Sequence, residues 1–537
     1  MASSAQAAVA PSPTTLLDKK IKRNPGKIGV IIFGTALLVG GIYAGWNLLS
    51  DLSHVQTSSA LVFVLLGFAL AIALGFEFVN GFHDTANAVA TVIYTHTLEP
   101  HVAVVYSGIL NFVGVLTSSG AVAFGIVSLL PVELILQVGS AAGFSMVFAL
   151  LVAAIMWNLG TWYFGIPNSS SHALVGSIMG VGLANQLMAT SHTGTTGVDW
   201  AQALKVGESL LFSPIIGFCA SALLLLLMKK VLPQKELYSE PHGDTPPPFW
   251  IRGLLMLTCG GVSFAHGSND GQKGMGLIML ILVGTVPTAY ALNHAVGYEQ
   301  VQTFVSVSQT TSHVLDHYIQ PGVSSSNANL DLERFVSSGK LTPQVMPALK
   351  WQIDSISQNV GTYKTLALIP TAITTNVRNQ MYLTSETLRL IEKKHTPRIS
   401  AEDNAFILNY KKQIDHATKF IPNWVKVAVA LALGLGTMVG WKRIVVTVGE
   451  RIGKTHLTYA QGAASELVAM TTILASDVYG LPVSTTHVLT SGVAGTMAAN
   501  HSGLQWSTIR SLAMAWVLTL PCSMALSGML YWLFRHL

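Results

Sequence analysis

The sequence predicts an all-α polytopic membrane protein: two inverted-topology repeats with broken or re-entrant helices, about 10–12 transmembrane segments, and a helical insertion. Three observations lead to this fold class. Half of the 537 residues are hydrophobic and only 10% are charged, whereas soluble proteins carry about 25% charge. The mean hydropathy is +0.51. Two polar motifs each occur twice, inside or beside apolar runs.

Apolar runs of about 20 residues, the length that crosses a bilayer, recur along the chain. The clearest are 28–49, 60–79, 102–127, 142–164, 207–228, 423–441, 457–475 and 511–534. The first run follows a basic tail and is too long for a signal-peptide core. We therefore expect a retained signal-anchor helix with the N-terminus in the cytoplasm.

The first repeated motif, which we call the Asp motif, contains an aspartate within an apolar stretch. Residues 80–88 read NGFHDTANA and residues 266–274 read HGSNDGQKG. Asp84 thus aligns with Asp270 at an offset of 186 residues. Glycines surround both aspartates and loosen the backbone, so we expect a helix break at each copy.

The second repeated motif, the Ser/Thr motif, contains Gly-X-Pro followed by three hydroxyl residues. Residues 165–174 read GIPNSSSHAL and residues 480–489 read GLPVSTTHVL. His172 aligns with His487 at an offset of 315 residues. Proline removes a backbone donor, so each copy must interrupt a helix.

The two motifs alternate along the chain, which indicates two homologous halves. The larger offset places 129 extra residues in the second half. This insertion carries twelve Lys/Arg and ten Asp/Glu; because so long a structureless loop would be unusual, we expect a small helical domain for assembly or regulation. The predicted divisions are the tail 1–27, the anchor helix 28–50, the first repeat 60–230, a cytoplasmic linker 231–250, the start of the second repeat 251–297, the insertion 298–422 and the rest of the second repeat 423–537.

Charge placement predicts the orientation of the halves. The basic segments 229–252 and 442–454 should be cytoplasmic. The repeat equivalent of the second segment, residues 127–139, contains no Lys or Arg. Matched loops of opposite charge bias predict that the two halves are inserted upside-down relative to each other.

The hydroxyl triplets are the candidate substrate ligands. A new helix begins at each triplet, and a helix N-terminus presents unpaired N–H groups to an anion. The simpler alternative is that one hydroxyl caps the helix, but one cap does not account for three hydroxyls in both halves. Whether His172 and His487 bind substrate or only pack is left open. The triplets are Ser169, Ser170, Ser171, Ser484, Thr485 and Thr486.

Asp84 and Asp270 are candidates for both substrate and coupling-ion binding, because an ionisable residue at membrane depth is costly. The alternative is a polar network that holds two helices together. Glu77 is a further candidate. The predicted coupling-ion or proton residues are Asp84, Asn87, His83, Asn269, Asp270 and Lys273.

A carboxylate that faces an anion is useful only if the anion carries a proton to donate. Phosphate is partly protonated near neutral pH and sulfate is not, so the aspartates favour phosphate over a sulfate or other oxyanion permease. An intramembrane hydrolase using Ser171 and His172 is disfavoured, since adjacent helical residues point in different directions. The sequence contains no nucleotide-binding loop of the G-x-x-x-x-G-K-[ST] kind, so nothing in it supports transport driven by ATP. The composition gives no sign of a nucleic-acid partner, a disulfide or a zinc site.

Both motifs closely resemble those of the PiT family of inorganic phosphate transporters. The stretches NGFHDTANAVATVIYT (80–95) and SFAHGSNDGQKGMGLIML (263–280) are most similar to its bacterial low-affinity branch. So are WNLGTWYFGIPNSSSH (157–172) and YGLPVSTTHVL (479–489), and the likeness covers nearly all of 60–535.

The resemblance implies symport of phosphate with a cation across the cytoplasmic (inner) membrane. The coupling ion would be H⁺ or Na⁺, a divalent metal could accompany phosphate, and no resident metal or cofactor is expected. A homodimer is one option for the assembly. Asp84, Asn87, Asn269 and Asp270 carry over as substrate or ion ligands, and the triplets as phosphate ligands.

Two positions depart from the family pattern. His83 replaces the first Asn of the motif, and Gln272-Lys273 replaces Ala-Asn in the second copy. Lys273 aligns with Asn87. Our hypothesis is that Lys273 acts as a resident cation, removes one Na⁺ site and favours proton coupling.

Overall fold

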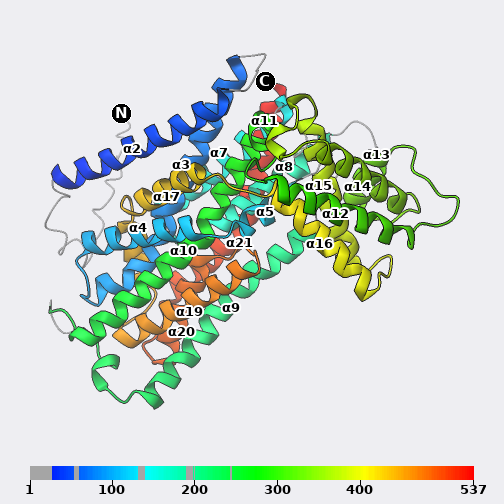
Figure 1. Ribbon diagram of the computed structural model, residues 1–537. Helices are drawn as coiled ribbons and strands as arrows, with labels where there is room; N and C mark the ends of the chain where they lie inside the picture. Colours follow the sequence, from blue (N-terminus) through cyan, green and yellow to red (C-terminus); the bar gives the residue numbers. More distant parts are fainter. Residues whose placement is uncertain (1–26, 54–59, 131–139, 189–197, 199, 242–244) are drawn as a thin grey trace, which may run out of the picture.

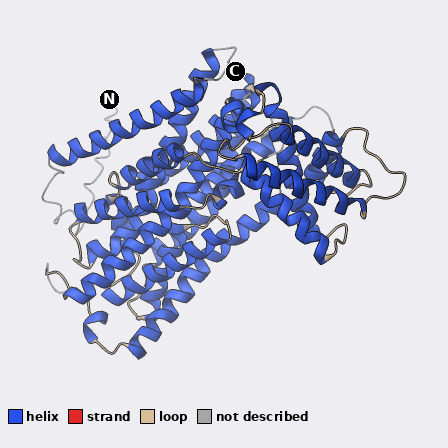
Figure 2. Ribbon diagram, viewed as in Figure 1, coloured by secondary structure: helices blue, strands red, loops and turns tan. Residues whose placement is uncertain are grey.

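The described part of the chain is mostly helical. The structure is a computed structural model that describes residues 27–53, 60–130, 140–188, 198, 200–241 and 245–537. No strand occurs in these ranges, apart from an isolated bridge between Gly453 and Leu504 (Figure 2). The predicted all-α fold is thereby confirmed for the described residues.

The helices fall into a long bundle and a smaller group beside it (Figure 1). The bundle contains α2 (Lys27–Leu52), α3 (Ala60–Tyr94), α4 (Pro100–Thr117), α5 (Ala121–Val127), α7 (Ala141–Tyr163), α8 (Ser170–Met188), α9 (Trp200–Val231), η1 (Lys235–Tyr238), α10 (Phe249–Thr285), α11 (Pro287–Tyr290), α17 (Asn423–Thr437), α18 (Lys442–Val446), η3 (Thr447–Arg451), α19 (Tyr459–Val478), α20 (Thr485–Ala499) and α21 (Trp506–His536). The smaller group contains α12 (Tyr298–Asp316), α13 (Ala328–Ser338), α14 (Val345–Gly361), η2 (Leu366–Leu368), α15 (Thr371–Lys394) and α16 (Ala401–Thr418).

Within the described residues, six helices are long and apolar enough to cross a membrane, namely α2, α3, α4, α7, α9 and α21. A seventh span is counted if α16 and α17, bent by 73°, form one broken span. The protein is therefore a multi-pass membrane protein. The expected total of 10–12 segments stays a prediction.

Both Asp motifs lie inside continuous helices. The expectation of a helix break at Asp84 and at Asp270 was wrong, since α3 runs through the first motif and α10 through the second. The glycines serve close helix packing instead. A Cβ at Gly81 would overlap the carbonyl oxygen of Leu433 on α17, and a Cβ at Gly267 would overlap that of Asn111 on α4.

This packing predicts a difference between two glycines of α3. Gly81→Ala should lower the free energy of unfolding by about 1–3 kcal/mol, because the added methyl overpacks the contact with α17. Gly75→Ala should not, since no atom lies within 4 Å of a Cβ there. Thermal unfolding of the purified protein in detergent measures both, and equal shifts in Tm would contradict the assignment.

The Ser/Thr motifs do interrupt helices, and each forms the tip of a helical hairpin. In the α19–α20 hairpin, the chain before α19 and the chain after α20 lie together, because Lys454 N donates to Gly503 O at 3.1 Å. In the α7–α8 hairpin, the start of α7 and the end of α8 both contact the end of α21. Ser145 Oγ donates to Phe534 O at 3.2 Å and Tyr531 OH donates to Asn185 Oδ1 at 2.9 Å.

The two hairpins open at opposite ends of the bundle. The start of α21 lies at the open end of the α19–α20 hairpin, where Gln505 N donates to Ile452 O at 3.0 Å. The end of α21 lies at the open end of the α7–α8 hairpin, as the contacts of Ser145 and Tyr531 show. Helix α21 has 31 residues, roughly 46 Å at 1.5 Å per residue, so it separates the two open ends.

The insertion has its own hydrophobic core. Apolar side chains of α12 to α16 form one buried cluster that includes Phe335, Leu349 and Ile414. The chain enters the insertion after α10 and α11 and leaves it at the start of α17. The insertion therefore lies at the C-terminal end of α10, whereas the basic segment 229–252 lies at the N-terminal end of α10 (Figure 1).

Candidate transport site

The candidate site lies where the two hairpin tips meet beside α3 and α10. The rings of His172 and His487 lie 4.6 Å apart between centroids and are tilted by 37°. Ser171 Oγ donates to the carbonyl oxygen of Val483 at 2.9 Å. Both tips are buried, so residues more than 300 positions apart share one polar interior.

The first hydroxyl of each triplet is a helix cap. Ser169 Oγ accepts from the backbone N–H of His172 at 3.2 Å. Ser484 Oγ accepts from the backbone N–H of His487 at 3.1 Å. The capping alternative is thus correct for one residue in each half. The other two hydroxyls of each triplet do not cap the helix.

The second hydroxyl of each triplet has no hydrogen-bond partner in the part of the chain that the structure describes. Ser170 Oγ and Thr485 Oγ1 are buried and form no hydrogen bond with any described residue. The two residues align at the offset of 315, so an unpartnered hydroxyl occurs at the same position in both halves. Each hydroxyl lies in the first turn of its helix, α8 or α20, where backbone N–H groups are also unpaired.

The third hydroxyl of each triplet contacts the Asp motif of the opposite half. Thr486 Oγ1 donates to Asp84 Oδ1 at 2.7 Å. Ser171 Oγ accepts from Lys273 Nζ at 2.5 Å. These contacts join the tip of each hairpin to the long helix of the other half.

Lys273 is fully buried and forms an ion pair with Asp270 on the same helix. Its Nζ lies 2.5 Å from Asp270 Oδ2, which neutralises one of the two motif carboxylates within the protein. A buried cation needs such a partner, because transfer of an unpaired charge from water is very costly. The position that holds an amide, Asn87, in the first half therefore holds a paired cation in the second.

His83 and Asn269, which align with each other, each contact the hairpin of their own half. His83 Nδ1 lies 3.1 Å from Asp84 Oδ1, and His83 Nε2 lies 3.2 Å from Thr161 Oγ1 at the end of α7. Asn269 Nδ2 donates to Leu481 O at 3.2 Å. The side chain of Asn87 lies outside the described residues.

Three further carboxylates lie near the site: Glu77 and Glu466 are buried, and Asp477 is half-buried. Glu77 lies against Gly274 on α10 and accepts from Asn80 Nδ2 at 3.4 Å. Sequence analysis missed Glu466 and Asp477. Glu466 accepts from Thr258 Oγ1 at 2.5 Å and from Thr91, and it is the single acid in the apolar run 457–475, a signal that could have identified it.

Asp477 anchors the tip of the second hairpin to α10. Its Oδ2 accepts from Ser268 Oγ at 2.6 Å, and its Oδ1 accepts from Gln272 Nε2 at 2.5 Å. The sequence repeat does not point to Asp477, because the residue at the equivalent position of the first half, at an offset of 315, is Trp162. Only the fold shows its role.

Asp84, His266 and Asp270 converge on one point. One ligand atom from each of these buried residues lies within 4.8 Å of the others. Carboxylate oxygens and an imidazole nitrogen are a ligand set that suits divalent transition metals. The chemistry of the group therefore fits a divalent cation.

Both Asp motifs and both Ser/Thr motifs fall within the match to a protein-family model. The model described as "Phosphate transporter family" matches residues 80–527. The chain belongs to the phosphate transporter family.

Relatives place it in the bacterial low-affinity branch of that family. It is 41% identical over 493 residues to the low-affinity inorganic phosphate transporter PitA of Escherichia coli (strain K12), covering 88% of this chain and 96% of PitA. It is 40% identical to PitB of the same strain, with the same coverage. A probable low-affinity inorganic phosphate transporter of Bacillus subtilis (strain 168) is 29% identical, covering 86% of this chain and 94% of the relative.

One solved structure is also similar. It is titled "The sodium-dependent phosphate transporter", with 18% identity, a TM-score of 0.47 and coverage of 88% of this chain and 100% of that chain. Members of the phosphate transporter family are transporters and not enzymes, which removes the hydrolase alternative.

Proposed function

We propose that this phosphate transporter is a secondary active symporter that imports inorganic phosphate with H⁺ across the cytoplasmic membrane. Phosphate would bind between the hairpin tips. We place phosphate there because two buried hydroxyls, those of Ser170 and Thr485, have no hydrogen-bond partner among the described residues. A buried polar group without a hydrogen bond is costly, and an oxyanion at the two helix N-termini would satisfy both hydroxyls.

The arrangement of the hairpins supports alternating access. They open at opposite ends of the bundle while their tips meet at the same site, as expected for inverted repeats. The two basic segments lie at one end, since Arg252 Nε donates to Thr97 O at 3.0 Å and Tyr94 OH donates to Glu450 Oε1 at 2.6 Å. We assign this end and the N-terminus to the cytoplasm by the positive-inside rule.

Lys273 supports H⁺ as the coupling ion rather than Na⁺. Its ammonium group already occupies a position between Asp270 and Ser171, where a Na⁺ ion would otherwise bind. Na⁺ coupling is the alternative. Sulfate or another oxyanion as substrate would be compatible with the hydroxyls but leaves Asp84 without a proton to accept.

In proteoliposomes, uptake of labelled phosphate should rise with an inward proton gradient and should not change with Na⁺ at fixed pH. Lys273→Asn, which copies the residue at position 87, should make uptake respond to Na⁺. Exposed Lys412 provides the matched control, Lys412→Asn, which should behave as the wild type. A requirement for Na⁺ at fixed pH in the wild-type protein would overturn H⁺ coupling.

A divalent metal would travel with phosphate as substrate. The convergence of Asp84, His266 and Asp270 supports this, because a metal–phosphate complex presents oxygens to the hydroxyls and a cation to the carboxylates. Varying Mg²⁺ independently of pH and Na⁺ in the same vesicles tests it. Uptake of phosphate that is insensitive to removal of divalent metal by a chelator would limit the substrate to phosphate alone.

A further inference from the structure

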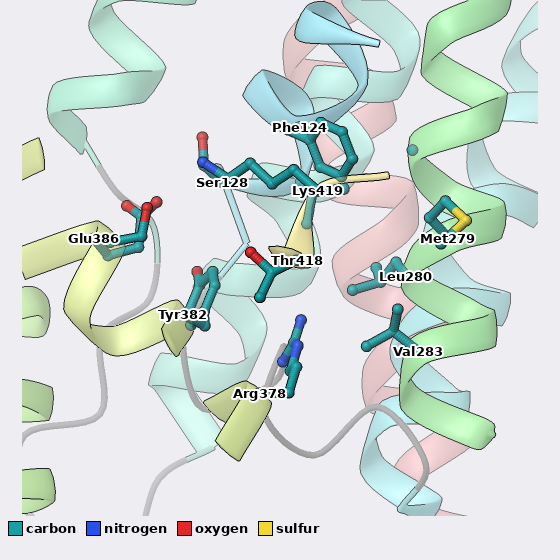
Figure 3. A pocket seen from close by; sticks show the side chains of 13 residues that line it. Phe124, Ser128, Met279, Leu280, Val283, Arg378, Tyr382, Glu386, Thr418 and Lys419 are labelled. Atoms are coloured by element: carbon teal, nitrogen blue, oxygen red, sulfur yellow. The ribbon is translucent and has the colours of Figure 1, made fainter. Parts of the chain in front are cut away.

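A cavity lies where the insertion meets the membrane bundle, and we call it the junction cavity (Figure 3). Its volume is about 70 Å³, several times the roughly 10–15 Å³ that one water needs. Apolar side chains of α5 and α10 form one side. The other side is polar and comes from α15, the end of α16 and the residue after α5. Representative lining residues are Phe124, Leu280, Arg378, Tyr382, Glu386 and Lys419.

Arg378 contributes a cation to this cavity without a carboxylate partner. Among the described residues it forms no ion pair; its guanidinium donates to Asn379 Oδ1 at 3.2 Å and lies 5.2 Å from the centroid of the Tyr382 ring. In Figure 3 it lies between Tyr382 and the apolar side chains Leu280 and Val283 of α10. Burial lowers the pKa of Arg378, as expected for a cation that loses water without gaining an anion.

The nearby carboxylates are already matched to other cations. Glu386 accepts from Arg389 Nε at 2.6 Å. Asp415 is paired with both Lys411 at 2.8 Å and Lys419 at 2.9 Å. Two lysines therefore share the Asp415 carboxylate. The charged side chains that line the cavity are Arg378, Lys419 and Glu386, so the lining has one more cation than anions.

We propose that the junction cavity binds a phosphate-bearing anion, through the guanidinium of Arg378 and the ammonium of Lys419. A guanidinium donates two parallel hydrogen bonds to phosphate oxygens. The cavity volume suits one tetrahedral group. The apolar wall from α10 is also compatible with the glycerol and acyl portion of a phospholipid, so free phosphate and a lipid headgroup are the two sources of the same chemistry.

Such an anion would connect the insertion to a helix of the transport site. Gly276 and Met279 line the cavity, and they follow Lys273 on α10 by three and six residues. An occupant that bridges α10 and α15 would therefore restrain the helix that carries Asp270. This assigns the insertion a regulatory role that goes beyond the proposed symport.

The first test uses free inorganic phosphate and the purified full-length chain. Its background is the double variant Ser170→Ala, Thr485→Val, which weakens phosphate binding at the hairpin tips. Phosphate should still raise Tm in this background, and adding Arg378→Gln should remove at least nine-tenths of that rise. Arg378→Lys should retain part of it, and Arg398→Gln, at an exposed arginine, should retain all of it.

The second test covers the lipid source. The wild-type chain and the Arg378→Gln and Arg398→Gln variants are extracted from bilayers with and without phosphatidylglycerol, and retained lipid is counted by native mass spectrometry. Loss of a retained phosphatidylglycerol in Arg378→Gln alone assigns the cavity to a lipid headgroup. If Arg378→Gln matches the wild type in retained lipid, and its parent double variant in phosphate-dependent Tm, the proposal is wrong, whatever the outcome for symport.

Discussion

Asp84→Asn is expected to reduce phosphate uptake about a hundredfold or more, in line with the loss of one preorganised polar group in a buried site. Asp84 is buried and accepts a hydrogen bond from Thr486 of the opposite half. An asparagine keeps the size of the side chain and an acceptor for Thr486. It cannot take a proton from phosphate, and its neutral amide holds a cation more weakly than a carboxylate does. The measurement is the initial rate of labelled phosphate uptake in proteoliposomes.

The same variant separates phosphate from other oxyanions. A sulfate permease would tolerate Asp84→Asn, because sulfate has no proton to donate near neutral pH. The matched control is Glu402→Gln at an exposed carboxylate of the insertion, which should transport as the wild type does. Undiminished uptake by Asp84→Asn would exclude Asp84 from the substrate and coupling sites, and a monodisperse elution profile would show that a loss of uptake is not a loss of folding.

Removing the two unpartnered hydroxyls is expected to raise the KM for phosphate. A hydrogen bond to a charged group contributes about 1.5–3 kcal/mol, which corresponds to roughly tenfold or more in affinity for each hydroxyl. Ser170→Ala and Thr485→Val should each raise KM about tenfold, and the double variant should raise it further. Since neither hydroxyl has a partner among the described residues, their loss should affect stability little.

Two controls make this prediction specific. Thr485→Ser keeps the hydroxyl and should retain a KM close to that of the wild type. Ser177→Ala removes a buried hydroxyl of the same helix as Ser170, but one that donates to Ala173 O at 2.8 Å within α8. A KM that rises as much in Ser177→Ala as in Ser170→Ala would mean that the triplet has no special role in binding phosphate.

Several features of the candidate site could be predicted from the sequence because they are local or repeated. Composition and apolar runs indicate a membrane protein, and the Gly-X-Pro breaks locate both hairpin tips. The doubled motifs identify Asp84, Asp270 and the two triplets without any structure. Local sequence did not predict that α3 and α10 continue through the Asp motifs, since glycine disfavours a helix unless a neighbouring helix packs against it.

The sequence by itself determined the membrane class, the family, the two repeated motifs and the set of candidate ligands. Only the tertiary structure decided how each triplet divides into a cap, an unpartnered hydroxyl and a contact to the opposite half. It also decided that Lys273 pairs with Asp270, and that Glu466 and Asp477 belong near the site. The physical reason is the range of the interactions. Hydropathy, helix breaks and capping depend on neighbours along the chain, whereas the partners of a buried charge, such as Asp84 and Thr486 at a separation of 402 residues, depend on how the helices pack.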